Sequence, residues 1–226
     1  VGRLISARAL GKEVPGITIN RYCASGLEAI SQAVSKINAG FGHIYIAGGA
    51  ESMSMIPFTG YKLAPSYKAN LENLNYHVGM GATAEAVAGK YNISREATDK
   101  FSYDSHMKAA SAIDGGKFKD QIVPIEIEEV FVADGKRKTK THTVVVDEGV
   151  RRETTLEGLA KLRPAFKIGG TVTAGNASQT SDGAAFTLVV SEEMVKQLNL
   201  KPIARMAGCA VGAVSYTHLR AHETKC

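Results

Sequence analysis

The clearest periodic pattern in the chain lies in residues 14–40, where the spacing of apolar residues changes from that of a strand to that of a helix. Ile17 and Ile19 stand two residues apart after a Pro–Gly pair, as in a buried strand. The apolar positions that follow fall on one helical face, and they are Leu27, Ile30, Val34 and Ile37. A strand is therefore expected to lead into a helix that ends near Gly40.

Similar patterns predict further elements on both sides of this segment. A weak helix is expected over residues 1–13, and a short strand over residues 43–47, before a glycine pair that marks a tight turn or a close backbone approach. Strand, helix and strand in this order predict a parallel βαβ unit and a layered α/β sheet. The remaining expected helices end near residues 91, 113, 162 and 198, and the remaining strands cover residues 123–127, 143–146, 186–190 and 202–209.

Individual residues mark the ends of several elements. Ser94 is a suitable N-cap, and Thr154 with Glu157 forms a possible capping box. The pair Asp134–Gly135 predicts a hairpin turn. The helix after Ser94 is expected to turn Phe101, Ala110 and Ile113 inward, and the basic run Lys136, Arg137, Lys138 and Lys140 is expected at an exposed hairpin tip.

Two stretches lack a regular pattern. Residues 57–75 are interrupted by Pro57, Gly60 and Pro65, which predicts a long surface segment. Residues 169–185 are dense in small and hydroxylated side chains, and Val172 is their one large apolar residue. A packed core does not need that composition, so we expect a loop that wraps a ligand.

The composition narrows the class of protein. With 226 residues, 44% hydrophobic and 22% charged, the chain suits a globular protein with a real core. It contains no apolar run of membrane-spanning length and no signal-peptide core, and the missing initiator Met indicates that it begins inside a larger protein. A net charge of +5 fits an anionic small molecule, and no basic stripe with interleaved aromatics indicates nucleic acid.

The three cysteines are Cys23, Cys209 and Cys226. Their wide spacing favours a reducing compartment, which we expect to be the cytoplasm, over a disulfide framework. His218 and His222 with Cys226 could be argued as a metal site, but no third ligand is in register, and no metal is expected. Residues 215–226 resemble translated vector sequence, so they are left out of the predicted fold.

Cys23 has a position with chemical meaning, at the turn between the first predicted strand and helix. Unpaired N–H groups at a helix N-terminus carry partial positive charge, which favours a thiolate. The next three residues are small, so that a substrate could approach the sulfur closely. The pattern alone leaves two interpretations open, an activated nucleophile and a small buried hydrophobic residue.

Taken together, ordered motifs across about residues 14–213 resemble the thiolase family. They are NRYCASGLEAI (20–30), AGGAESMS (47–54), GMGATAEAVAGKYNISRE (79–96), GKFKDQIVP (116–124), DEGVR (147–151), LRPAF (162–166) and GTVTAGNASQTSDGAA (170–185). The NRYC form, the SQTSDGAA loop and Gly79, where short-chain enzymes carry a His, look most like degradative 3-ketoacyl-CoA thiolases. The resemblance implies a layered αβαβα architecture that is incomplete at both ends.

The resemblance also implies a domain division. Residues 1–56 would be part of the N-terminal core, 57–168 a loop domain covering the CoA site, 169–200 the return to the N-terminal core, 201–214 the start of the C-terminal core, and 215–226 a non-native tail. The family is typically dimeric or tetrameric, so a homo-oligomer of the full-length protein is expected, with CoA thioesters as its partners and no membrane span.

Site residues carry over by motif. Cys23 would be the nucleophile that forms an acyl thioester, and its N–H would donate to the thioester oxyanion. Arg151 would lie against the adenine nucleotide of CoA, and Met80 would border the acyl pocket. The pantetheine channel would be lined by Phe166, Ala174 and Ser178. CoA is a substrate here, and no resident cofactor is expected.

The family's Asn-Glu-Ala-Phe segment, Gly-His-Pro histidine and Cys-x-Gly cysteine do not occur in the chain, and neither His77 nor His106 lies in such a histidine turn. The expected function is thiolytic cleavage of 3-ketoacyl-CoA by the parent protein, with the 226-residue chain alone inactive. Three alternatives stay open: a biosynthetic acetoacetyl-CoA thiolase, a non-catalytic acyl-CoA or lipid carrier, and, least favoured, a binding module that folds alone.

Overall fold

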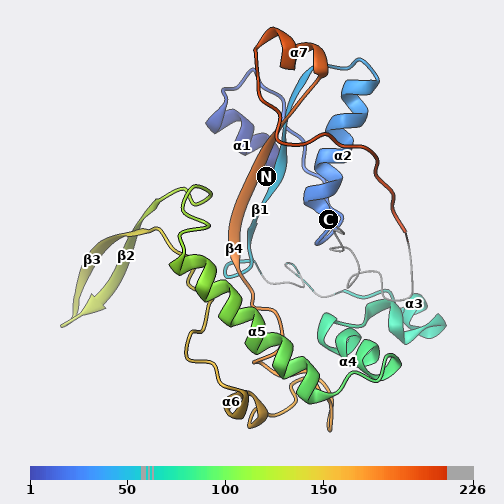
Figure 1. Cartoon of the computed structure of the whole chain (residues 1–226), viewed down its shortest axis with the longest axis vertical. Coiled ribbons are helices and arrows are strands. Elements are labelled where there is room, and N and C mark those ends of the chain that lie inside the picture. The colour runs from blue at the N-terminus through green and yellow to red at the C-terminus, as the bar shows by residue number, and fades with distance from the viewer. Residues whose placement is uncertain (57–59, 61, 63, 213–226) are drawn as a thin grey trace. The chain divides into compact units, whose positions relative to one another are not determined.

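The computed structural model describes residues 1–56, 60, 62 and 64–212 (Figure 1). The chain forms two compact units, one of Val1–Met80 with Thr180–Cys226 and the other of Gly81–Gln179. Both contain helices and strands, so the predicted mixed α/β class is confirmed. The expected tail with His218, His222 and Cys226 lies outside the described residues, as does part of the segment 57–75. The domain limits expected from the sequence stay a prediction.

The first unit is built on an antiparallel ribbon of β1 (Ile44–Ser52) and β4 (Asp182–Val190), with Ile44 opposite Val190 and Ser52 opposite Asp182. Helix α2 (Ser25–Asn38) packs against both strands (Figure 1). The helix ends at Ala39 before Gly40, whose φ is 75°, as the sequence predicts. Both strands are present where the pattern places them and extend further than it predicts.

The glycine pair after the predicted strand lies inside β1. A Cβ at Gly48 would overlap the backbone carbonyl oxygen of Ala185 and the Cα of Phe186, whereas a Cβ at Gly49 would meet open space. Gly48 therefore permits the two backbones to approach closely. Of the two expectations for this pair, the close approach is confirmed and the tight turn is not.

Short helices complete the first unit. They are α1 (Gly2–Ala9), α3 (Tyr67–Glu72), the 3₁₀ helix η1 (Leu74–His77) and α7 (Glu192–Gln197). The weak N-terminal helix and the helix ending near residue 198 are confirmed. Among the described residues of this unit, the buried side chains are the small ones of Ser6, Ala33 and Ala47.

The second unit contains α4 (Met80–Lys90, whose first residue belongs to the first unit), α5 (Arg95–Asp114) and α6 (Leu156–Ala160). Ser94 caps α5 as predicted, because its hydroxyl accepts the Ala97 N–H at 3.2 Å. The buried residues of this unit are Thr83, Glu85, Ala88, Asp99, Ala110, Leu159, Val172 and Thr173. Half of them are polar, so hydrogen bonds as well as apolar contacts organise this interior.

A β-hairpin of β2 (Ile125–Ala133) and β3 (Lys136–Val144) belongs to the second unit. Its turn residues Asp134 and Gly135 have φ values of 55° and 70°, the left-handed conformation that a two-residue hairpin turn requires. The predicted hairpin is confirmed. The basic run is exposed as predicted, but it lies along β3 rather than at the tip.

Two predicted strands, the parallel pairing and one predicted inward residue are wrong. Residues 17–19 and 202–209 form no strand, because no described strand lies alongside to complete a hydrogen-bonded ladder. Helix α2 is therefore not part of the predicted parallel βαβ unit. The strand that pairs with β1 is β4, which runs antiparallel to it. The inward position of Phe101 is also wrong, since this ring is 77% exposed while Asp99 on the same helix is buried.

The cap of α6 is shifted by one residue from its predicted place. The Thr155 hydroxyl accepts the Gly158 N–H at 3.0 Å. The Thr154 hydroxyl instead donates to the carbonyl of Arg151 at 2.7 Å, and Thr155 is the N-cap residue.

Candidate active site

The candidate nucleophile Cys23 lies in a tight turn just before α2, one residue ahead of the N-cap Ala24, and its side chain is exposed. The Ala24 N–H donates to Arg21 O and the Ser25 N–H to Tyr22 O, both at 3.0 Å. The predicted position at the start of the helix is confirmed. The chain enters it from an irregular segment rather than from a strand.

Two polar side chains fix this turn. Asn20 Oδ1 accepts the Tyr22 N–H at 2.7 Å, and Ser25 Oγ accepts the Arg21 N–H at 2.8 Å while donating to Tyr22 O at 2.6 Å. Tyr22 has φ of 46°, a left-handed conformation that is uncommon outside glycine and costs about 1–3 kcal/mol. The surrounding bonds hold this strained residue next to Cys23, as is common at functional turns.

The charges beside the turn are already paired. Arg21 Nε lies 2.8 Å from Glu28 Oε2 in the first turn of α2. Hydrogen bonds from Gln32 and then from Arg21 hold the pKa of Glu28 below its usual value. Arg21 is therefore engaged by Glu28 rather than by Cys23.

The two histidines weighed from the sequence have other positions. His77 is the last residue of η1, and His106 lies on α5, where its Nδ1 accepts the Arg151 N–H at 3.2 Å. That neither is the family's catalytic histidine stays a prediction from the sequence.

In the second unit, a buried carboxylate on α4 binds the start of the small-residue loop. Glu85 is 7% exposed, and its two oxygens accept the N–H of Thr171 at 3.0 Å and that of Val172 at 2.8 Å. Burial raises the pKa of Glu85, but the bonds from Thr171 and Val172 outweigh it and the pKa lies below its usual value. Glu85 is therefore an ionised anchor for this loop.

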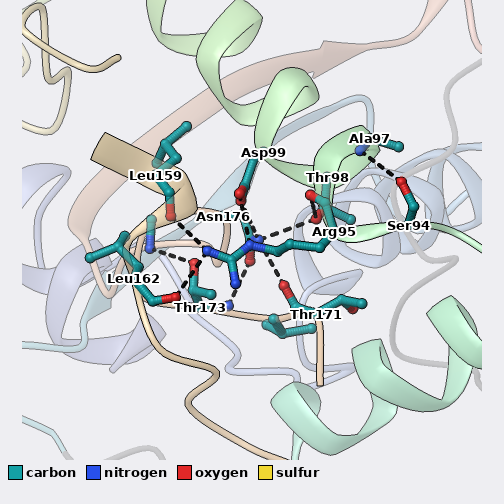
Figure 2. A network of polar contacts seen from close by, with 12 residues as sticks. Ser94, Arg95, Ala97, Thr98, Asp99, Leu159, Leu162, Thr171, Thr173 and Asn176 are labelled. Carbon is teal, nitrogen blue, oxygen red and sulfur yellow. Dashed lines mark hydrogen bonds and ion pairs between the residues drawn. The ribbon is translucent and has the colours of Figure 1, made fainter. Parts of the chain in front are cut away.

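The same loop is tied to α5 by a network of polar contacts around Asn176 (Figure 2). The Asn176 amide donates to Asp99 Oδ1 at 2.9 Å and to Thr98 Oγ1 at 3.2 Å. Asp99 is 4% exposed and pairs with Arg95 Nε at 2.7 Å. The buried charge of Asp99 is thus compensated by a cation and a neutral donor.

The residues expected to bind CoA fall in both units. In the first unit, Met80 is half-buried at the start of α4. In the second, the ring of Phe166 packs on Gly81 so closely that a Cβ there would overlap it. Arg151, Ala174 and Ser178 are exposed, and the last two share the loop that Asn176 holds. These roles stay predictions.

A shallow cleft of about 220 Å³ lies in the second unit, lined by Glu85, Ala88, Gly89, Asn92, Ile93, Lys167 and Gly169–Thr171. It contains none of the predicted site residues. Among the described residues, no group of three or more His, Cys, Asp or Glu side chains could hold a metal ion. No helix in the described part of the chain is long and apolar enough to span a membrane.

The sequence interpretation missed Glu85, Asp99 and Asn176. Their signals were weak but present, because Glu85 stands among alanines at helical spacing and Asp99 follows Arg95 by four residues. Asn176 lies in the middle of the small-residue stretch, and its side chain is the largest polar one in that stretch ahead of Gln179.

Comparison with known proteins connects these features to one family. The thiolase N-terminal domain matches residues 3–193. A 3-ketoacyl-CoA thiolase of Bacillus subtilis (strain 168) is 48% identical over 202 residues, which are 89% of this chain and 52% of that protein. The chain spans about half the length of the curated relatives it matches.

Solved structures agree. The crystal structure of human mitochondrial 3-ketoacyl-CoA thiolase has a TM-score of 0.72 and 36% sequence identity, and the match covers 89% of this chain and 52% of the human chain. The structure of the same enzyme in complex with CoA has a TM-score of 0.71. An acetyl-CoA acetyltransferase from Syntrophomonas wolfei gives 0.71 at 34% identity, with the same coverage as the human enzyme. From the domain match and these similarities, the chain belongs to the thiolase family.

Proposed function

We propose that the protein containing this chain cleaves 3-ketoacyl-CoA with CoA, giving acetyl-CoA and a shortened acyl-CoA. The observation that carries the proposal is the position of Cys23, an exposed thiol in a strained and hydrogen-bonded turn at the start of α2. The names of its relatives support this substrate class, and the human relative has been solved with CoA.

In the proposed reaction the Cys23 thiolate adds to the 3-keto carbon and forms an acyl thioester. The bond between the α- and β-carbons breaks, and its electron pair leaves with acetyl-CoA, which takes up a proton at the α-carbon. The thiol of a second CoA then attacks the thioester, transfers the acyl group and frees Cys23.

CoA is proposed to lie along residues contributed by the second unit. Arg151 would contact the adenine nucleotide, and Phe166, Ala174 and Ser178 would line the pantetheine channel, while Met80 would border the acyl group. The exposure of Arg151, Ala174 and Ser178 supports this assignment, because a binding residue must be reachable from solvent.

Two further steps need groups that this chain does not contain. Thiolysis requires a base to activate the attacking thiol and an acid to protonate the α-carbon. The Gly-His-Pro histidine and Cys-x-Gly cysteine of the family are absent from the sequence. We therefore propose that the 226-residue chain by itself has no turnover, and that the full-length protein is active as a dimer or tetramer in a reducing compartment, with the cytoplasm as the first compartment to test.

The decisive test is Cys23→Ala in the full-length protein, with Cys209→Ala as the matched control, because both thiols are free and exposed. Cys23→Ala should lower turnover by at least about a thousandfold, and Cys209→Ala should leave it unchanged. Mass spectrometry should find the acyl group on Cys23 in the unsubstituted protein. Wild-type turnover in Cys23→Ala would overturn the proposal. An unsubstituted full-length protein that binds no CoA, and whose Cys23 thiol shows no selective reactivity, would favour a lipid carrier.

A second function is favoured by one observation, since one of the similar solved structures is that of an acetyl-CoA acetyltransferase. Such an enzyme would join two acetyl groups through the same cysteine. Comparing kcat/KM on acetoacetyl-CoA with that on a long-chain 3-ketoacyl-CoA separates the two functions, because the proposed degradative enzyme should prefer the longer substrate.

A further inference from the structure

The loop of residues 171–178 has an inner and an outer side. Thr173 is fully buried, and its carbonyl accepts the N–H groups of Asn176 at 3.3 Å and Ala177 at 3.0 Å, which curls the chain into a single turn. Ala174 and Ser178, on either side of Asn176 in the sequence, are exposed. The turn therefore directs one set of residues inward while leaving the predicted pantetheine contacts accessible.

Asn176 makes four hydrogen bonds that fix this turn (Figure 2). Its Oδ1 accepts the Thr173 N–H at 2.7 Å, and its Nδ2 lies 2.9 Å from both Asp99 Oδ1 and Thr171 O and 3.2 Å from Thr98 Oγ1. The orientation of the amide is determined by its surroundings. Turning it over would face Oδ1 toward the Asp99 carboxylate and Nδ2 toward a backbone donor, losing bonds on both sides.

The groups that receive the Asn176 amide are themselves held in place. Arg95 Nε pairs with Asp99 Oδ2, and Arg95 Nη2 donates to the carbonyls of Leu159 at 2.6 Å and Leu162 at 3.0 Å. One guanidinium thus connects α5 to the end of α6 and orients the carboxylate toward Asn176. Most of these contacts are part-buried and all of them join groups of the chain itself, so the fold sets their geometry.

We propose that Asn176 is a positioning residue for CoA, acting through the loop that presents Ala174 and Ser178. This inference rests on the proposed function. The half-buried Asn176 side chain is engaged by groups of the chain itself, so its proposed contribution is to keep the two exposed positions in one geometry before CoA arrives. A preformed loop spares CoA the entropy cost of ordering it.

The test uses the full-length protein with Asn176→Ala, and with Asn38→Ala as the matched control, because Asn38 is an exposed residue at the end of α2. Asn176→Ala should raise KM for CoA by about tenfold, since each lost hydrogen bond is worth a factor of about two to twelve. Alkylation of Cys23 by iodoacetamide, a reagent without CoA, should keep its rate. A variant that merely lost folded protein would lower kcat and the labelled fraction and leave KM unchanged.

Amide hydrogen exchange supplies a readout that does not depend on CoA. In Asn176→Ala the amides of residues 171–178 should exchange at least about tenfold faster, while Asn38→Ala leaves them unchanged. If Asn176→Ala does not fold, Thr98→Val removes a single acceptor of the amide and should give roughly two- to threefold changes in the same direction.

The outcomes separate the two proposals. Unchanged exchange in the loop, or an unchanged KM with faster exchange, overturns the positioning role of Asn176. If the unsubstituted protein does not bind CoA, the proposed function is overturned. The exchange measurement still decides whether Asn176 orders the loop. If exchange in Asn176→Ala is not faster, the ordering of the loop by Asn176 is overturned as well.

Discussion

The two segments proposed to act on the substrate are held in different ways. The turn around Cys23 is fixed by side chains close to it in the sequence, such as Asn20, Ser25 and the Arg21–Glu28 pair. The loop of residues 171–178 is fixed by Glu85, Thr98 and Asp99, which are 77 to 87 positions away from their partners in the chain. The nucleophile depends on local sequence, whereas the proposed CoA loop depends on the tertiary fold of the second unit.

The difference extends to the kind of interaction. In the first unit the backbone ladder of β1 and β4 carries the structure, and its buried side chains are small. In the second unit buried carboxylates accept the hydrogen bonds of the loop. We therefore expect the first unit to be sensitive to side-chain volume and the second to charge and pH, and four substitutions test this difference.

The largest effect is expected from Gly48→Ala in the ribbon. The added Cβ would overlap the backbone of β4, so the strands must separate at a cost of about 3 kcal/mol in the free energy of unfolding. Gly49→Ala is the matched control, because its Cβ would meet open space. Urea unfolding measures both, and equal effects at the two glycines would show that strand contact at Gly48 is unimportant.

Removing the loop anchor should have the next largest effect. Glu85→Ala leaves the N–H groups of Thr171 and Val172 without their acceptor and should lower the free energy of unfolding by about 2 kcal/mol. The control Glu153→Ala removes an exposed carboxylate of the same unit. Faster hydrogen exchange at residues 170–173 should accompany the first change and not the second; a loop that exchanges at its original rate contradicts the anchor.

A smaller effect is expected from acid. The folded pKa of Glu85 lies below the value of 4.5 that it has when unfolded. A depressed pKa means that the stabilisation is fully present above about pH 4.5 and is lost as the pH falls through the folded pKa. Unfolding midpoints between about pH 7 and 3 should therefore fall less steeply in Glu85→Gln than in the unsubstituted protein, and parallel curves would exclude this contribution.

The smallest effect is expected at a helix cap of the second unit. Ser94→Ala removes the acceptor of the Ala97 N–H and should cost about 1 kcal/mol. Ser105→Ala, at an exposed position inside α5, should instead stabilise by a few tenths of a kcal/mol, because alanine is the better helix former. Thermal unfolding distinguishes the opposite signs, and a loss at Ser105 equal to that at Ser94 would contradict the cap.

These local and distant contacts explain what could be predicted from the sequence. The α2 helix, the Ser94 cap and the Asp134–Gly135 turn follow from residues a few positions apart, and all three are present. The ordered motifs across about residues 14–213, taken together, identified the family. The roles of Glu85 and Asn176 could not be predicted, because each depends on a partner 77 or more positions away.

The wrong predictions have two physical causes. The apolar residues at 17–19 and 202–209 favour a strand in the sequence, but a strand exists only where another backbone pairs with it. The position of Phe101 was assigned from hydrophobicity, while the buried side of α5 is decided by the Arg95–Asp99 pair and Asn176. Polar contacts overrode the hydrophobic pattern at this helix.

The β1–β4 ribbon also has a consequence for biosynthesis. Its end is closed by His43 and Ser191, which are 148 positions apart. At a synthesis rate of about 5–20 residues per second, β1 leaves the ribosome roughly 7–30 seconds before its partner is complete. During that interval Ile44 and Ile46 stand on an unpaired strand edge, the kind of edge that other chains can join. The length of the connecting segment therefore sets the period in which this strand edge is exposed on the nascent chain.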